Sequence, residues 1–225
     1  TDIARACEDA ARATDACICN SEGATLYTQR SSFVYGNTHG FIGGYPTSRH
    51  SLSCAVIAQE GDDMQRDYWY DSDRLPDGLE SPEAIGRRAA ERTVARLNGR
   101  KLGTRTCPVL FRSDIAPSLL RSLFGAIRGH AIYRKSSFLL DRVGEQIFPD
   151  WVQISEDPLR PRGQASAPFD NEGVATAYRE LVSDGVLQGY LLDSYAARKL
   201  GLQSTASAGG VHNATIGSSG QTFEE

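Results

Sequence analysis

The sequence contains no long basic run, no long apolar run and no Cys-x-x-Cys pair, and each absence excludes a class of protein. Its 24 Lys and Arg residues are outnumbered by 28 Asp and Glu residues, which leaves a net charge of −4. Nucleic-acid-binding domains concentrate basic residues to neutralise phosphates, so no nucleic acid is expected as a partner. The longest apolar stretch, residues 119–132, is interrupted by Arg121 and Arg128. A membrane span needs about 20 mostly apolar residues, so no membrane is expected as a partner either.

The cysteines are scattered along the chain, at positions 7, 17, 19, 54 and 107. Cys17 and Cys19 are two residues apart, so on a strand they share one face and cannot easily bridge each other. No further Cys or His follows them at the spacing of a zinc finger. An odd number of unpaired thiols suits a reducing compartment, which predicts a cytoplasmic location.

The first half of the chain has the patterns of one helix, a sheet and a second helix. Apolar residues recur at helical spacing in residues 2–14. Residues 16–73 contain β-rich runs separated by turn clusters, which predicts an antiparallel meander of about five strands. Ser81 is the predicted N-cap of the next helix, Pro82 is its first residue, and the helix is predicted to end at Gly99.

Residues 100–106 read as a linker, which predicts two domains, residues 1–103 and 104–225. The expected elements of the second domain are a buried strand at 108–111, a helix capped by Ser113 or Asp114, a strand at 151–154, a hairpin joining 177–182 to 186–192, and a helix at 195–200 ending at Gly201. Residues 204–220 are rich in Gly, Ser and Ala and read as a flexible loop. The predicted fold class is α+β with mainly antiparallel sheet.

Few residues outside one helix suggest chemistry. The segment around Gly209 and Gly210 lacks the spacing and the terminal Lys of a phosphate-binding loop. Asp170 and Glu172 lie two apart in a turn-like segment, where they can serve as acid, base or metal groups in a cleft, or simply form a solvated turn. His212 lies in the Gly-rich loop and can approach a ligand there.

The exception is the helix ending in residues 125–130, Gly-Ala-Ile-Arg-Gly-His. Zinc proteases use His-Glu-x-x-His because residues i and i+4 share a helix face, and a variant with one more intervening residue needs an unwound turn before the second histidine. Gly129 and His130 suit that ending. Gly125 stands where the first histidine belongs, and Ala126 stands where the glutamate belongs. An ordinary helix C-terminus with a capping glycine and a histidine near the dipole is the simpler local interpretation.

Several ordered segments resemble the TldD/PmbA metallopeptidase family, and specifically its PmbA branch. They include Tyr-Arg-Lys-Ser-Ser-Phe-Leu-Leu-Asp at 133–141, Pro-Phe-Asp-Asn-Glu-Gly-Val at 168–174 and Ala-Gly-Gly-Val-His-Asn at 208–213. Other segments at 20–24, 35–40, 48–53, 147–151 and 194–202 extend the resemblance over almost the whole chain. The resemblance implies a middle fragment, with an N-terminal domain and the rest of the C-terminal domain outside this sequence.

The resemblance also implies a cytosolic bacterial protein that acts with a TldD-type sister subunit as a dimer. That subunit carries His-Glu-x-x-x-His and the expected zinc, and the pair degrades or trims unfolded peptides, including precursors of peptide antibiotics. This chain keeps only Gly129 and His130 of the motif. We therefore expect a non-catalytic partner subunit, with no catalytic residue and no cofactor of its own.

Two alternatives remain open at this stage. One is an active zinc enzyme whose site is reassembled from His130 with His212, Asp170 or Glu172. The other is a regulatory protein-binding modulator. For a partner subunit, we expect strand edges to bind extended peptide backbone. The predicted walls of that site are the hairpin at 177–192 and the loop at 208–213, which includes Gly209, Gly210, His212 and Asn213.

Overall fold

The computed structural model describes residues 1–218 and 220, which form two compact units. Unit 1 contains Thr1–Ser32 and Pro46–Cys107, and unit 2 contains Phe33–Tyr45 and Pro108–Glu225. The sheets are antiparallel and carry separate helices, so the predicted α+β class is confirmed. The hairpin end Phe33–Tyr45 groups with unit 2, although it is early in the sequence.

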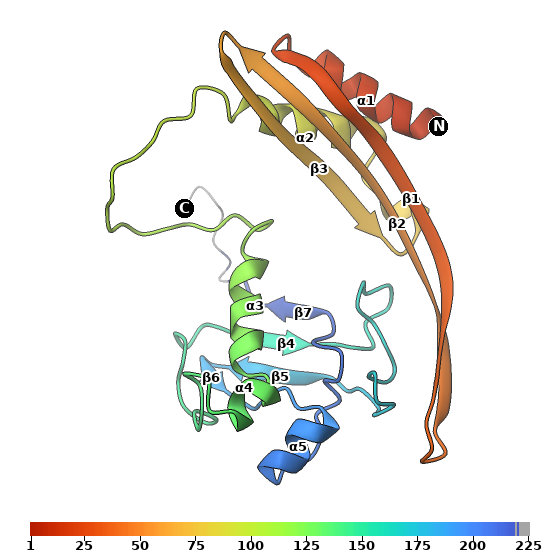
Figure 1. The fold of residues 1–225 in the computed structure, drawn as a ribbon, viewed down its shortest axis with the longest axis vertical. Helices are drawn as coiled ribbons and strands as arrows, with labels where there is room; N and C mark the ends of the chain where they lie inside the picture. Colours follow the sequence, from red (N-terminus) through yellow and green to blue (C-terminus); the bar gives the residue numbers. More distant parts are fainter. Residues whose placement is uncertain (219, 221–225) are drawn as a thin grey trace. The chain divides into compact units, whose positions relative to one another are not determined.

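Three long strands, β1 (Ile18–Gly36), β2 (Ile42–Glu60) and β3 (Asp63–Asp73), form one sheet in the order β1-β2-β3, which lies in unit 1 except for the hairpin end Phe33–Tyr45 (Figure 1). The prediction of about five shorter strands was wrong. Gly23 has a φ of +98° and lies within β1, and Gly43 and Gly44 lie within β2, so these residues do not reverse the chain. The chain turns instead at Asn37, whose N–H bonds to the Phe41 carbonyl, and at Gly61.

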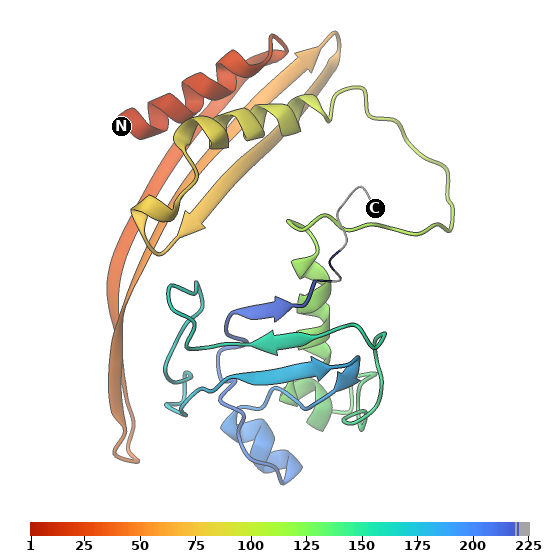
Figure 2. The ribbon, with the colours of Figure 1, turned by 180° about the vertical axis from the view of Figure 1, so that it is seen from behind.

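Helices α1 (Asp2–Thr14) and α2 (Pro82–Val94) lie on the same face of this sheet (Figure 2). Alternate residues of β2, such as Leu52 and Val56, are buried with Ile85 of α2 in one core cluster. A Cβ added at Gly86 would overlap the backbone carbonyl of Cys7, so the absence of a side chain allows the two helices to approach closely.

The start of α2 is confirmed, and its predicted end was wrong. The Ser81 hydroxyl accepts a hydrogen bond from the Ala84 N–H at 3.2 Å. The helix stops at Val94 rather than near Gly99, because the N–H groups of Arg96 and Leu97 bond three residues back, to Thr93 and Val94. Asn98 then adopts a left-handed φ of 60° and is held by the carboxylates of Glu60 and Asp63.

Unit 2 contains a four-stranded antiparallel sheet in the order β6-β5-β4-β7 (Figure 1). Its strands are β4 (Ile154–Glu156), β5 (Arg179–Ser183), β6 (Val186–Leu187) and β7 (Ala214–Ile216). Its helices are α3 (Pro117–Ala126), α4 (Gly129–Tyr133) and α5 (Ser194–Leu200). Leu123 and Ile127, at the end of α3, pack in one core cluster with Ile154, Leu181 and Val182 of the sheet.

Two predictions for unit 2 are confirmed closely. The β5–β6 hairpin turns at Asp184 and Gly185, which both have positive φ, and Val182 pairs with Leu187. Helix α5 ends at Gly201, which has the left-handed φ of 68° expected of a C-terminal glycine cap.

Three other predictions for this unit were wrong. Residues 108–111 form no strand, and Val109 and Leu110 are exposed. Helix α3 begins at Pro117 without a side-chain cap, because the N–H groups of Ile115 and Ala116 already bond to Arg112 in a preceding turn. Residues 204–218 are not a loose loop, since they contain the strand β7 and the buried Ser207.

Among residues 1–218 and 220, the helices are all too short or too polar to cross a membrane. The five cysteines are free thiols. Cys7 of α1 and Cys54 of β2 meet in the core of unit 1, and their mutual hydrogen bond, together with burial, raises the pKa of the Cys7 thiol.

Candidate functional site

The helix predicted to end at His130 is two helices with a break between them. Helix α3 ends at Ala126, Arg128 has an extended backbone, and His130 lies in the first turn of α4. The break is held by Leu191, whose N–H donates to the Ile127 carbonyl at 3.0 Å and whose carbonyl accepts from the Gly129 N–H at 2.8 Å. His130 therefore does not cap a helix C-terminus. The unwound turn that a His-x-x-x-x-His spacing requires is present.

Packing requires one of the two glycines of this segment and not the other. A Cβ added at Gly129 would overlap the Ala196 Cβ and lie 2.9 Å from the Leu192 Cδ2, so Gly129 permits close packing of α4 near α5. A Cβ added at Gly125 would meet no atom within 4 Å. Packing explains Gly129, whereas no contact in the described structure explains Gly125.

Alanine substitution at these two positions is expected to have opposite effects on the free energy of unfolding. Gly129→Ala forces two packed helices apart and should cost about 1–3 kcal/mol. Gly125→Ala removes a glycine from an α-helix without a clash, so it should be neutral or stabilising by up to about 1 kcal/mol. Urea denaturation of the two variants measures the difference, and equal effects would contradict this explanation.

His130 contacts one carboxylate and two tyrosine rings. Its Nε2 lies 3.7 Å from Oδ2 of Asp193, and its ring packs against those of Tyr133 and Tyr195 at centroid distances of 5.5 and 6.2 Å. Asp193 is also the N-cap of α5, since its Oδ1 accepts from the Ala196 N–H at 2.7 Å. A catalytic zinc needs three protein ligands and an open position. A single histidine and a capping carboxylate do not meet that need.

The expected convergence of His130 with His212, Asp170 or Glu172 is not found in the structure. Within residues 1–218 and 220, the His, Cys, Asp and Glu side chains form no group of three or more that could hold a metal ion. The carboxylates of Asp170 and Glu172 instead accept hydrogen bonds from backbone N–H groups.

Asp170 is buried at the centre of its turn, with 2% of its surface exposed. Its Oδ1 accepts from the N–H groups of Glu172 and Val174 at 2.9 and 3.0 Å, and its Oδ2 accepts from the Ala208 N–H at 3.1 Å. The expectation of a solvated turn at Asp170 is thus wrong. The carboxylate ties the turn at 168–174 to the loop at 204–213.

The other predicted residues of these two loops also hold backbone in place. The Glu172 Oε2 accepts from the Ser194 N–H at 2.8 Å, at the start of α5. Gly209 has a φ of +103°, and a Cβ there would lie 2.6 Å from the Asn171 amide nitrogen. Gly210 has a φ of +128°. The Asn213 amide donates to the Asp157 carbonyl and to the Ser166 hydroxyl at 2.8 and 2.7 Å.

A buried ion pair lies beside His212. The Glu156 carboxylate accepts from Arg179 Nε and from the His212 backbone N–H, the latter at 3.0 Å. Arg179 Nη2 donates to the Ser207 Oγ at 2.6 Å. Burial lowers the pKa of the His212 imidazole, although the carboxylates of Glu156 and Asp170 act in the opposite direction. A largely neutral His212 follows near pH 7.

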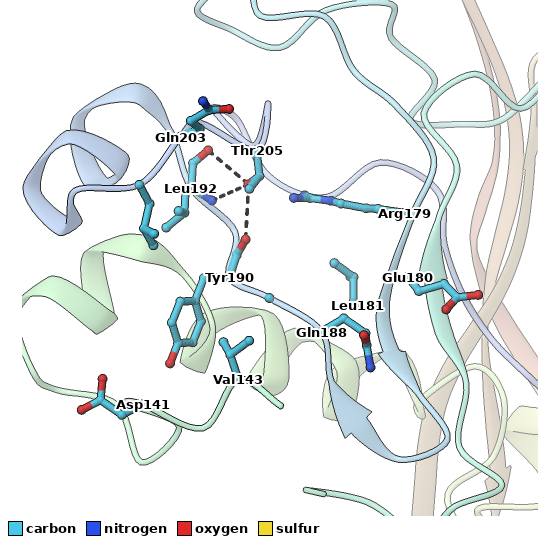
Figure 3. Close-up of a pocket in the computed structure, with 12 residues that line it drawn as sticks. Asp141, Val143, Arg179, Glu180, Leu181, Gln188, Tyr190, Leu192, Gln203 and Thr205 are labelled. Carbon is cyan, nitrogen blue, oxygen red and sulfur yellow. Dashed lines mark hydrogen bonds between the residues drawn. The ribbon is translucent and has the colours of Figure 1, made fainter. Parts of the chain in front are cut away.

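Arg179 connects this network to a cavity of about 680 Å³ within unit 2 (Figure 3). Its side chain reaches from β5 toward the loop that carries Thr205. The hydroxyl of Thr205 is held by the Leu192 N–H at 2.7 Å. The cavity is lined by Asp141, Val143, Arg179, Glu180, Leu181, Gln188, Gly189, Tyr190, Leu192, Leu202, Gln203 and Thr205. Its volume is within the range of small-ligand and peptide side-chain pockets.

The structure thus brings the predicted loop residues into one region and shows which backbone groups they bond to. Asp170, Glu172 and Asn213 bond to neighbouring backbone groups, and Gly209 packs against Asn171; their role in substrate binding stays a prediction. The hairpin at 177–192, predicted as a peptide-binding wall, does line the cavity. Glu156, Arg179 and Thr205 were not expected, because a polar residue on a short strand or in a Gly-rich loop has no distinguishing sequence pattern.

Comparison with known proteins gives matches over the whole chain. Residues 104–225 match the PmbA/TldA metallopeptidase C-terminal domain, and residues 1–97 match the PmbA/TldA metallopeptidase central domain. The chain is 48% identical over 224 residues to Metalloprotease PmbA of Escherichia coli O157:H7, covering 100% of this chain and 50% of that protein. It is 47% identical over 213 residues to the Metalloprotease PmbA homolog of Haemophilus influenzae, covering 95% and 47%.

Solved structures have the same fold. One from Bacteroides thetaiotaomicron, proposed in its name as a modulator of DNA gyrase, is 27% identical with a TM-score of 0.89, and the match covers 96% of this chain and 49% of that one. TldE from Thermococcus kodakarensis is 20% identical with a TM-score of 0.76, over 97% and 51%. The chain spans about half the length of the curated relatives it matches.

Proposed function

The chain belongs to the PmbA/TldD metallopeptidase family, and from this premise we propose that it is the non-catalytic, peptide-holding subunit of a two-subunit metallopeptidase. The observation that carries the proposal is the pair Gly125 and Ala126, which stand where a zinc ligand and a proton acceptor belong. Neither side chain can coordinate a metal or accept a proton. His130, the remaining member of the motif, pairs with Asp193.

The partner in this proposal is a TldD-type sister subunit that carries an intact His-Glu-x-x-x-His motif and the zinc. The two subunits form a dimer in the cytoplasm and act on unfolded peptides, including peptide-antibiotic precursors that are trimmed to maturity. Zinc in the sister supplies the activated water for hydrolysis. The residues of this chain bind and position the peptide.

The cavity beside β5 supports a role in peptide binding. On one side β5 pairs with β4, whereas on the other side only Val182 and Ser183 pair with β6 and the Leu181 carbonyl accepts from the Gln188 N–H at 3.0 Å. Arg179 and Glu180, at the end of β5 beyond this pairing, line the cavity together with Leu181. An extended peptide that pairs with this end adds a strand through main-chain hydrogen bonds, which are insensitive to peptide sequence.

A peptide-turnover assay tests this division of labour. A fluorogenic peptide without stable structure is incubated with the full-length protein alone, with the TldD-type sister alone, and with both together. Turnover should require the sister and should be highest with both subunits. Hydrolysis by the full-length protein alone, sensitive to a zinc chelator, would contradict the proposal.

A further inference from the structure

A second cavity, of about 390 Å³, lies within unit 1 and has no role in the proposal above. Its walls come from α1, β1, β2 and the segment before α2. Its apolar part includes Ile3, Leu26, Leu52, Pro76, Leu79 and Pro82, and its polar part includes Thr28, Arg30, His50, Glu80 and Ser81. Small-molecule sites have this composition, mostly apolar with a few polar groups that fix orientation.

His50 is the first of two groups that point to a ligand. It lines the cavity with only 3% of its surface exposed, and its Nδ1 lies 3.3 Å from the Thr28 Oγ1. Its Nε2 has no hydrogen-bond partner among residues 1–218 and 220. This nitrogen is not one of the fully buried atoms that lack a partner, so solvent reaches it and it is available to a polar group that binds in the cavity.

Arg30 is the second group. It lies two residues beyond Thr28 on β1, so both side chains emerge on the same face of the sheet as His50. Diagonal neighbours on adjacent strands are within reach of a long side chain. In the described part of the chain, the Arg30 guanidinium makes no hydrogen bond, ion pair or ring contact.

Glu80 is the acidic side chain of this cavity, and it is already paired. Its Oε1 accepts from Arg88 Nη1 at 3.0 Å. The positive charge of Arg30 is therefore left without a local counter-charge. An anion is the complement of an unpaired guanidinium beside an N–H donor.

We propose that this cavity binds a small carboxylate that has a short aliphatic body. The carboxylate accepts hydrogen bonds from the Arg30 guanidinium and from His50 Nε2–H, while the Thr28 hydroxyl donates to Nδ1 and so selects that tautomer of the imidazole. The aliphatic body lies on Leu26, Leu52 and Leu79. Both a free carboxylic acid and the C-terminal residue of a peptide have this chemistry.

Isothermal titration of the full-length protein with defined probes tests the proposal. Hexanoate and N-acetyl-leucine represent the free acid and the peptide C-terminus, so their relative affinities distinguish the two sources. Hexanamide lacks the charge and acetate lacks the apolar body. Each is expected to bind at least about tenfold more weakly than the better carboxylate, since both interactions are needed.

Substitutions identify the site. Arg30→Gln should weaken carboxylate binding at least about tenfold, and because Arg30 is exposed and unpaired it should leave thermal stability unchanged. Arg49→Gln is the matched control, since Arg49 lies on β2 and bonds to Ser72 instead. Binding should be unchanged in that variant.

Two results would overturn the proposal. The first is that neither hexanoate nor N-acetyl-leucine binds at millimolar concentration. This result would also be obtained if the rest of the full-length chain filled the cavity, and it would overturn the proposal in that case too. The second is binding that Arg30→Gln leaves unchanged or that hexanamide matches. Peptide turnover by the two-subunit enzyme is measured separately, so failure of this site is distinguishable from failure of the proposed function.

Discussion

Asp170→Ala is expected to lower the free energy of unfolding by about 3–5 kcal/mol. The carboxylate is buried and accepts from three backbone N–H groups, those of Glu172, Val174 and Ala208. Alanine leaves those donors buried without a partner. Chemical denaturation of the full-length protein, followed by circular dichroism, measures the change.

Asp150→Ala is the control for this prediction. Asp150 is exposed and makes no hydrogen bond or ion pair with the described residues, so its removal should change stability by less than about 0.5 kcal/mol. Asp170→Asn should fall between the two, because an amide keeps one acceptor oxygen. If Asp170→Ala cost no more than the control, the carboxylate would not be the tie between the two loops.

Gly189→Phe is expected to reduce peptide turnover by the two-subunit enzyme by at least about tenfold. Gly189 lines the cavity beside β5, and a Cβ added there meets no atom within 4 Å. A phenyl ring can therefore occupy the space without disturbing the fold. A steady-state assay with an unfolded peptide should show a raised KM, because peptide binding is blocked while the sister's zinc chemistry is untouched.

Gly103→Phe is the matched control for the cavity. Gly103 likewise has no atom within 4 Å of an added Cβ, and it lies in an exposed segment that does not line the cavity. Its turnover should equal that of the unaltered enzyme. If the Gly189→Phe enzyme turned over peptide as fast as the unaltered enzyme, the cavity would have no role in peptide binding.

Local signals predicted part of the fold and long-range contacts decided the rest. Ser81 and Gly201 act within a single helical turn, and both helix ends were predicted correctly. The break between Ala126 and Gly129 depends on Leu191, far along the chain, and the sequence does not show that pairing. Similarly, the glycines of β1 and β2 look like turn residues until the neighbouring strand is known.

The candidate site was predicted in location better than in role. Asp170 and the loop around Gly209 do lie together, and the Asp170 carboxylate bonds to the Ala208 N–H of that loop. The residue type alone does not distinguish a carboxylate that accepts hydrogen bonds from backbone N–H groups from one that takes part in catalysis. Arg179 and Glu156 are found only when β4 and β5 are paired, because their strands are separated by more than twenty residues.

The most direct test of the central claim is the zinc content of the full-length protein, measured per chain by atomic spectroscopy, alone and in complex with the TldD-type sister. The account predicts no stoichiometric zinc in the lone protein, zinc in the complex, and turnover by the complex that changes by less than about twofold on His130→Ala. One tightly bound zinc per lone chain, together with loss of activity on His130→Ala, would contradict it.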